Sequence, residues 1–265
     1  MTSSLIHYSR WLVADYYQSA WAETLAIYLS GAPSMPSDKS HYVEILASAK
    51  IDLVVPDYYG YGRSAGFFDV KWCVQTAYDT VQVFRDSVPL VDVYGDHEIL
   101  PPLYKEIVVV GSSYGGRVAA WLPKFDESVQ EVVLLAPLLE DLGEGEESDE
   151  EFLRQYLLGY KGMYRLNPDY EPLDAMLGFD QLFTREDLGH LEGVKVFVGH
   201  GSADSIIHPK RSERFVQDLQ RQFPHGTYQY AWYYGLGHGG LMSRAGLSGW
   251  LYWRELNNEQ WGISN

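Results

Sequence analysis

Short apolar runs alternate with amphipathic segments along this chain. We expect strands where β-branched and aromatic residues cluster, and helices where apolar residues recur at the spacing of one helix face. The predicted strands are residues 4–10, 11–17, 25–29, 51–55, 107–110, 129–136, 194–198 and 227–234, and the predicted helices are residues 39–49, 72–85, the segment after 113, and 209–223. Residues 86–104 carry several prolines and are expected to be irregular. This alternation predicts an α/β fold, with a mostly parallel sheet and helices on both faces.

One predicted strand leads directly into a serine that lies between two glycines, in the run Gly111-Ser112-Ser113-Tyr114-Gly115. The spacing Gly-x-Ser-x-Gly is typical of a nucleophile elbow, a sharp strand-to-helix turn that exposes the serine. Glycine is needed there because the residues two before and two after the serine crowd one another. Ser113 is therefore the candidate nucleophile, and Ser112 is not, because Val110 would take its first glycine position. The pattern alone also fits an ordinary strand-turn-helix junction.

Two further residues with catalytic chemistry follow predicted strands. Asp204 comes after the strand at 194–198, and His238 comes after the strand at 227–234. Because active sites of open α/β sheets lie at the carboxyl ends of the strands, Ser113, Asp204 and His238 are expected to meet at one edge. The imidazole of His238 would take the hydroxyl proton of Ser113, and Asp204 would hold that imidazole in the required tautomer.

The sequence resembles the α/β-hydrolase superfamily, and the resemblance covers nearly the whole chain. Three motifs carry it: the elbow around Ser113, the turn from Asp57 through Gly60, Gly62 and Ser64, and the segment Gly201–Pro209 together with Gly237-His238-Gly239. The resemblance implies an oxyanion hole formed by the backbone amides of Tyr114 and Ala32. Ser30 stands where many members have a histidine.

The resemblance also implies a domain organisation. Residues 1–265 would form a single α/β-hydrolase domain, with a core of residues 1–137 and 191–265 and a cap or lid at 138–190. In some members of the superfamily the acid follows an earlier strand. Glu140 and Asp141 are therefore the alternatives to Asp204.

Composition narrows the class of protein. At 265 residues, 46% of them hydrophobic and 15% aromatic, the chain can bury a sizeable core. The formal net charge of −16 argues against nucleic acid and anionic membranes as partners, and mildly against acyl-CoA as a substrate. The single cysteine, Cys73, excludes an internal disulfide and a cysteine-based metal site. With no apolar run long enough to span a membrane and no leader pattern, a cytoplasmic location is expected.

Other motifs receive less specific interpretations. His200 and His208 flank Asp204 and could orient it, although packing or loop capping is the more usual role of such residues. Gly60-x-Gly62-x-x-Ala65 superficially matches a dinucleotide-binding turn, but the residues after it do not open a helix cleanly. No cofactor or metal is therefore predicted.

The sequence predicts a serine hydrolase that cleaves carboxylic esters with short to medium apolar acyl groups through an acyl-enzyme. Its substrate would be a small apolar ester. A serine peptidase or a thioesterase could use the same three residues. The alternative from another class is a non-catalytic binding module with the same fold.

Overall fold

A computed structural model describes residues 2–8, 12–19, 21–32, 40–94, 97–139, 159, 162–166 and 187–260. Within these residues one sheet has the strand order β10-β9-β8-β7-β3-β4-β2-β1-β5-β6. The strands are β1 (Thr2–Tyr8), β2 (Leu12–Gln18), β3 (Thr24–Leu29), β4 (Ile51–Pro56), β5 (Leu90–Asp92), β6 (Glu98–Ile99), β7 (Glu106–Ser112), β8 (Glu131–Leu135), β9 (Lys195–Gly201) and β10 (Tyr228–Tyr233). The helices are α1 (Ser40–Ser48), α2 (Val70–Arg85), α3 (Tyr114–Trp121), α6 (Lys210–Gln222) and α7 (Gly240–Gln260), with short 3₁₀ turns η1 (Leu122–Lys124) and η2 (Gly189–Leu191).

The central part of the sheet is parallel. β10, β9, β8, β7, β3 and β4 pair in parallel, whereas β2 pairs antiparallel with β4 and β1 pairs antiparallel with β2. The central parallel strands β3, β4 and β8 are buried throughout, as expected for a sheet that is covered on both sides, whereas the edge strand β10 is partly exposed. The predicted fold class, a mostly parallel sheet with helices on both faces, is confirmed.

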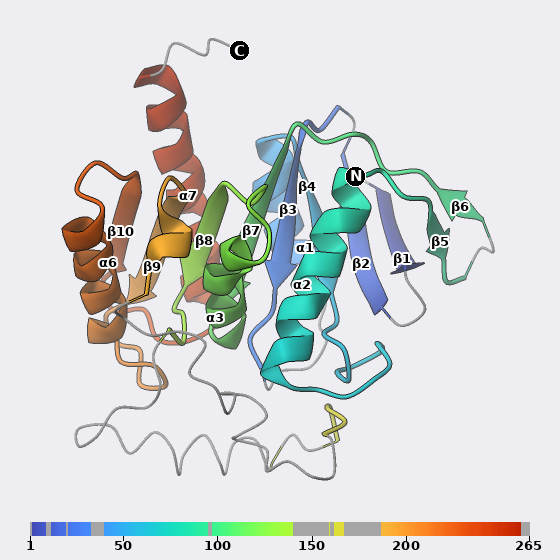
Figure 1. The fold of residues 1–265 in the computed structure, drawn as a ribbon, viewed down its shortest axis with the longest axis horizontal. Coiled ribbons are helices and arrows are strands. Elements are labelled where there is room, and N and C mark those ends of the chain that lie inside the picture. Colours follow the sequence, from blue (N-terminus) through green and yellow to red (C-terminus); the bar gives the residue numbers. More distant parts are fainter. Residues whose placement is uncertain are drawn as a thin grey trace.

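Helices cover both faces of this sheet (Figure 1). α2, α3 and α6 lie on one face, and α1 and α7 lie on the other. On the second face Leu46 of α1 and Met242, Leu247 and Trp250 of α7 share one apolar core. These side chains are at most 1% exposed, so each helix is held mainly by its buried face.

Two parts of the fold differ from the sequence-based expectation. Residues 86–104, expected to be irregular, contain β5 and β6, which extend the sheet beyond β1. The long C-terminal helix α7 was not predicted at all. The spacing of Met242, Leu247 and Trp250 fits one helix face and is the signal that could have indicated it.

Most of the expected cap, 138–190, lies outside the described residues, as do Glu140 and Asp141. The cap therefore stays a prediction. One short piece of it, residues 162–166, contacts the turn after β4: the amide of Gly62 donates to the carbonyl of Met163 at 3.0 Å, and Arg165 exchanges backbone hydrogen bonds with Gly60 and Phe68 at 2.7 Å. Because the glycine-rich turn pairs with protein backbone and α2 begins only at Val70, it does not have the form of a dinucleotide-binding turn.

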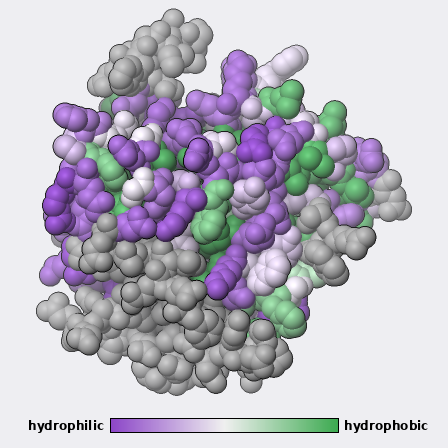
Figure 2. All heavy atoms as spheres, in the orientation of Figure 1, coloured by the Kyte–Doolittle hydropathy of each residue, from purple (hydrophilic) through white to green (hydrophobic). Residues whose placement is uncertain are grey.

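The described surface is mainly polar on the side that carries α2 and α6. Figure 2 shows hydrophilic residues over most of this face, with hydrophobic side chains in small separate groups where described residues are drawn. None of the described helices is long and apolar enough to cross a membrane.

Candidate active site

The nucleophile candidate lies at the junction of β7 and α3. Ser113 has φ 55° and ψ −122°, a backbone conformation that residues other than glycine rarely adopt. Backbone hydrogen bonds hold it there, since its amide donates to Leu135 at 2.9 Å and its carbonyl accepts from Gly116 and Leu138 at 2.9 and 3.0 Å. The strain is thus supported by β8 and by the first turn of α3. Ser113 is half-buried.

The two glycines of the elbow are required by close backbone approach. A Cβ atom at Gly111 would lie 2.2 Å from the carbonyl oxygen of Gly115, and one at Gly115 would lie 2.0 Å from the carbonyl oxygen of Leu29. Neither contact can be relieved by a side-chain movement, because the atoms met are backbone. The fold therefore requires glycine at both outer positions of the Gly-x-Ser-x-Gly motif.

The loop after β3 lies against the elbow. A Cβ atom at Gly31 would be 2.9 Å from Cβ of Ser113, so the backbone before Ala32 runs directly beside the candidate nucleophile. The phenol of Tyr58 donates a 2.8 Å hydrogen bond to the carbonyl of Ser30 and thereby anchors this loop. Ala32, which follows Gly31 in this loop, and Tyr114, which follows Ser113, stay the predicted oxyanion-hole residues.

The acid and the histidine predicted from sequence are in direct contact. Asp204 follows β9, His238 follows β10, and Nδ1 of His238 lies 2.7 Å from Oδ2 of Asp204. The side chain of Asp204 is fully buried, and that of His238 is 20% exposed. Because β7, β9 and β10 are parallel, Ser113, Asp204 and His238 all follow the carboxyl ends of strands on the same edge of the sheet.

The surroundings of Asp204 favour its ionised form. Burial by itself raises the pKa of this carboxyl, but hydrogen bonds from His200 and His238, the charge of His238 and the amide of Ile207 outweigh burial, so that the pKa lies well below the ordinary value. Oδ1 accepts from the amides of Ile206 and Ile207, both at 2.9 Å. Asp204 is therefore a carboxylate held in one orientation, as required for a group that supports a neighbouring imidazole.

This low pKa predicts that Asp204 makes folding pH-dependent. An unfolded chain has an aspartate pKa of about 3.9, whereas the folded value is lower. The stabilisation is thus present above about pH 4 and is lost as the pH falls toward the folded pKa. Urea denaturation between about pH 6 and pH 3 should show a steeper loss of unfolding free energy for the wild type than for Asp204→Asn. Parallel pH profiles for the two proteins would contradict this assignment.

The neighbouring histidines behave differently from one another. His200 was expected to pack or cap a loop, yet its Nε2 lies 3.0 Å from Oδ2 of Asp204. His208 is exposed and contacts its own loop through the amide of Lys210. Orientation of Asp204 was the less usual of the two roles that the sequence offered for His200, and a polar residue at the end of the apolar run of β9 is the signal of a buried partner.

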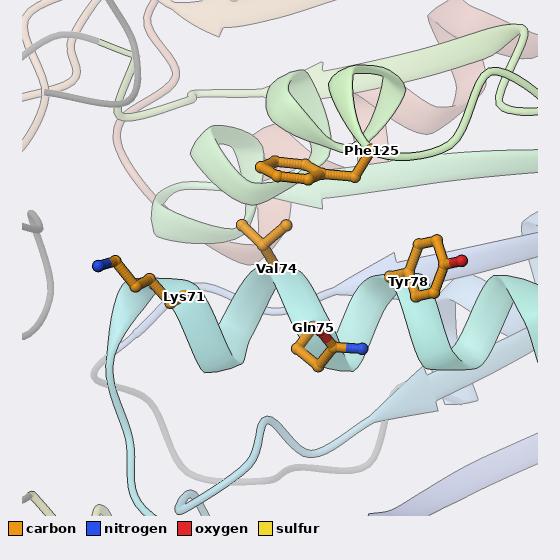
Figure 3. Close-up of a pocket in the computed structure, with 5 residues that line it drawn as sticks. All are labelled: Lys71, Val74, Gln75, Tyr78 and Phe125. Carbon is orange, nitrogen blue, oxygen red and sulfur yellow. The ribbon is translucent and has the colours of Figure 1, made fainter. Parts of the chain in front are cut away.

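A surface cavity of about 440 Å³ lies elsewhere, along the outer side of α2. Lys71, Val74, Gln75 and Tyr78 line it from the helix, and Phe125 lines it from the residues after η1 (Figure 3). None of the three candidate catalytic residues contributes to this cavity. Among the described residues, no group of three or more histidine, cysteine, aspartate or glutamate side chains could hold a metal ion.

The strand order, the elbow and the Asp204–His238 pair define a protein of the α/β-hydrolase class. A comparison with protein families matches residues 18–247 to the alpha/beta hydrolase family. The chain therefore belongs to that family. A comparison with curated proteins found no match.

Solved structures share this fold at low sequence identity. An esterase from Pyrococcus furiosus is 14% identical, with 98% of this chain and 88% of that chain covered and a TM-score of 0.60. A monoacylglycerol lipase from Paleococcus ferrophilus is 15% identical, with 91% and 98% covered and a TM-score of 0.56. A bromoperoxidase from Bacillus anthracis is 13% identical, with 96% and 100% covered and a TM-score of 0.65. These similarities show the fold, and the different activities in their names show that the fold does not determine the reaction.

Proposed function

We propose that the protein is a serine hydrolase that cleaves carboxylic esters through an acyl-enzyme. The observation that carries the proposal is the 2.7 Å hydrogen bond between Nδ1 of His238 and Asp204. When Nδ1 carries the hydrogen that faces the carboxylate, Nε2 has its lone pair available to accept a proton. A strained, half-buried serine at the end of β7, on the same edge of the sheet, is the residue type that needs such a base.

Each step of the reaction has a residue assigned to it. Oγ of Ser113 attacks the ester carbonyl carbon while its proton passes to Nε2 of His238, and the amides of Tyr114 and Ala32 stabilise the oxyanion. His238 then gives that proton to the departing alcohol, and the acyl group stays on Ser113. Water attacks the acyl-enzyme, loses a proton to His238, and the carboxylic acid leaves as Ser113 regains its hydrogen. Asp204 stays ionised and stabilises the imidazolium.

An apolar ester is the substrate class that the charge of the chain supports. The formal net charge of −16 repels polyanionic substrates, whereas a neutral ester is unaffected. The esterase and lipase names among the structural neighbours are compatible with this choice. A predicted cap of about 50 residues would limit the acyl chain to short or medium length.

Substrate series test the ester assignment directly. For p-nitrophenyl esters we expect kcat/KM to rise a few-fold per carbon, because each buried methylene contributes about 0.8 kcal/mol, and then to fall once the pocket is full. Acyl-CoA thioesters should react poorly, and their rates should improve between about 0.01 M and 0.15 M salt as repulsion is screened. Peptide amides, measured in parallel, should not be cleaved.

The competing functions predict other outcomes in the same assay. A thioesterase would prefer acyl-CoA at low salt, and a serine peptidase would cleave the peptide amides. A binding module would turn over none of the substrates. Any of these results would reject the ester assignment even with the geometry of Asp204 and His238 unchanged.

A further inference from the structure

A second histidine shares the carboxylate of Asp204. His200 is fully buried at the end of β9, and its Nε2 lies 3.0 Å from Oδ2 of Asp204 and 3.0 Å from the carbonyl oxygen of Ile207. On the other side of the ring, Nδ1 lies 2.7 Å from Oγ of Ser212 on α6. The ring therefore connects β9 and α6 to the loop that carries the acid.

The partners determine which nitrogen carries hydrogen. A carbonyl oxygen and an ionised carboxylate can only accept, so Nε2 of His200 must be a donor. In the neutral ring Nδ1 then accepts from the hydroxyl of Ser212. Oδ2 of Asp204 consequently receives hydrogen bonds from two imidazoles, His238 at 2.7 Å and His200 at 3.0 Å.

This arrangement completes the hydrogen bonding of the carboxylate. Oδ1 accepts from the backbone amides of Ile206 and Ile207, and Oδ2 accepts from the two histidines. The backbone amides belong to the same loop as Asp204, so they cannot orient that loop relative to the sheet. Among the side chains that contact Asp204, His200 is the one that lies on the sheet itself.

We propose that His200 is a positioning residue, which holds Oδ2 of Asp204 in line with Nδ1 of His238 by a hydrogen bond from β9. The proposal rests on the proposed function, because it assigns a partner to the triad acid. His200 acts through Asp204 and does not touch the reacting atoms. Ser212 supports it by fixing the orientation and tautomer of the ring.

Replacing His200 by asparagine or by glutamine distinguishes a positioning role from a packing role. The amide nitrogen of glutamine can reach the position of Nε2, whereas the shorter asparagine reaches only that of Nδ1. His200→Asn should lower kcat for a p-nitrophenyl ester by about 10- to 100-fold, in the range found for outer partners that orient a functional group. KM should change less than about threefold, and His200→Gln should recover most of the rate. A packing role predicts equal effects of the two substitutions.

The second readout is the coupling between His200 and Asp204, measured as kcat of the double variant. In the Asp204→Asn background, His200→Asn should change kcat by less than about twofold, because residues that act as a unit are not additive. Tyr8→Phe is the control. It removes a buried 2.8 Å hydrogen bond between Tyr8 of β1 and Thr80 of α2, several strands away from β9 in the sheet. It should lower thermal stability and leave kcat unchanged.

The outcomes distinguish the two proposals. If Asp204→Asn alone leaves kcat unchanged, the triad assignment fails and this inference fails with it. If Asp204→Asn is slow but His200→Asn and His200→Gln act equally, or the effects multiply in the double variant, His200 only packs and the proposed function stands. If His200→Asn does not fold, Ser212→Ala decides: it should lower kcat at least about threefold with KM unchanged, and an unchanged kcat overturns the inference.

Discussion

We expect Ser113→Ala to reduce kcat for ester hydrolysis by a factor of about 10⁶, the loss seen when the serine of a known triad is removed. Alanine keeps the Cβ atom and the backbone hydrogen bonds of Ser113 to Leu135 and Gly116, so the strained elbow is retained. Only Oγ, the atom that forms the acyl-enzyme, is lost. Stopped assays with a p-nitrophenyl ester and mass spectrometry after treatment with an alkyl fluorophosphonate measure turnover and covalent labelling.

Ser112→Ala is the matched control for this experiment. Ser112 is the adjacent serine, and its hydroxyl lies 3.2 Å from that of Ser243 on α7. Its substitution should leave the fluorophosphonate on Ser113 and the rate within about tenfold of the wild type. Labelling at Ser112, or undiminished turnover by Ser113→Ala, would reject the assignment of the nucleophile.

Asp204→Asn lowers kcat by about 10³ to 10⁴ if Asp204 is the triad acid. Asparagine has one oxygen where aspartate has two. If that oxygen accepts the amides of Ile206 and Ile207, the NH₂ group faces the donor nitrogens of His238 and His200. His238 must then change tautomer, and Nε2 carries a hydrogen when it should accept one.

Asp126→Asn is a control for the loss of a buried acid. Asp126 is 7% exposed and accepts hydrogen bonds from Gln82 and Ser128, away from the candidate site. This variant should fold less stably but retain its kcat. An effect of Asp204→Asn below about tenfold would direct the search for the acid to Glu140 or Asp141.

The elbow could be predicted from sequence because most of its physical cause is local. Gly111 is needed because a Cβ atom there would meet the carbonyl of Gly115, four residues along the chain, and the run of β-branched residues before it is itself the strand. The need for glycine at Gly115 comes from a distant segment, because a Cβ atom there would meet the carbonyl of Leu29. The strand-end positions of Asp204 and His238 also follow from sequence, since parallel strands place their carboxyl ends on one edge.

β5 and α7 could not be predicted in the same way. β5 is a strand because Val91 and Asp92 pair with His7 and Ile6 of β1, and its own residues do not determine that partner. The course of α7 depends on burial of Met242 and Trp250 against the sheet. In both cases contacts between distant segments decide the secondary structure.

The sequence by itself determined the fold class, the strained serine and the residue types of the candidate triad, because each depends on neighbours along the chain or on strand periodicity. Only the tertiary structure decided that Asp204 is shared by His238 and His200 and that Ser212 completes the chain of contacts. These partners come from a strand, two loops and a helix. Hydrogen bonds act over about 3 Å, so their pairing is determined only after the sheet and α6 have packed.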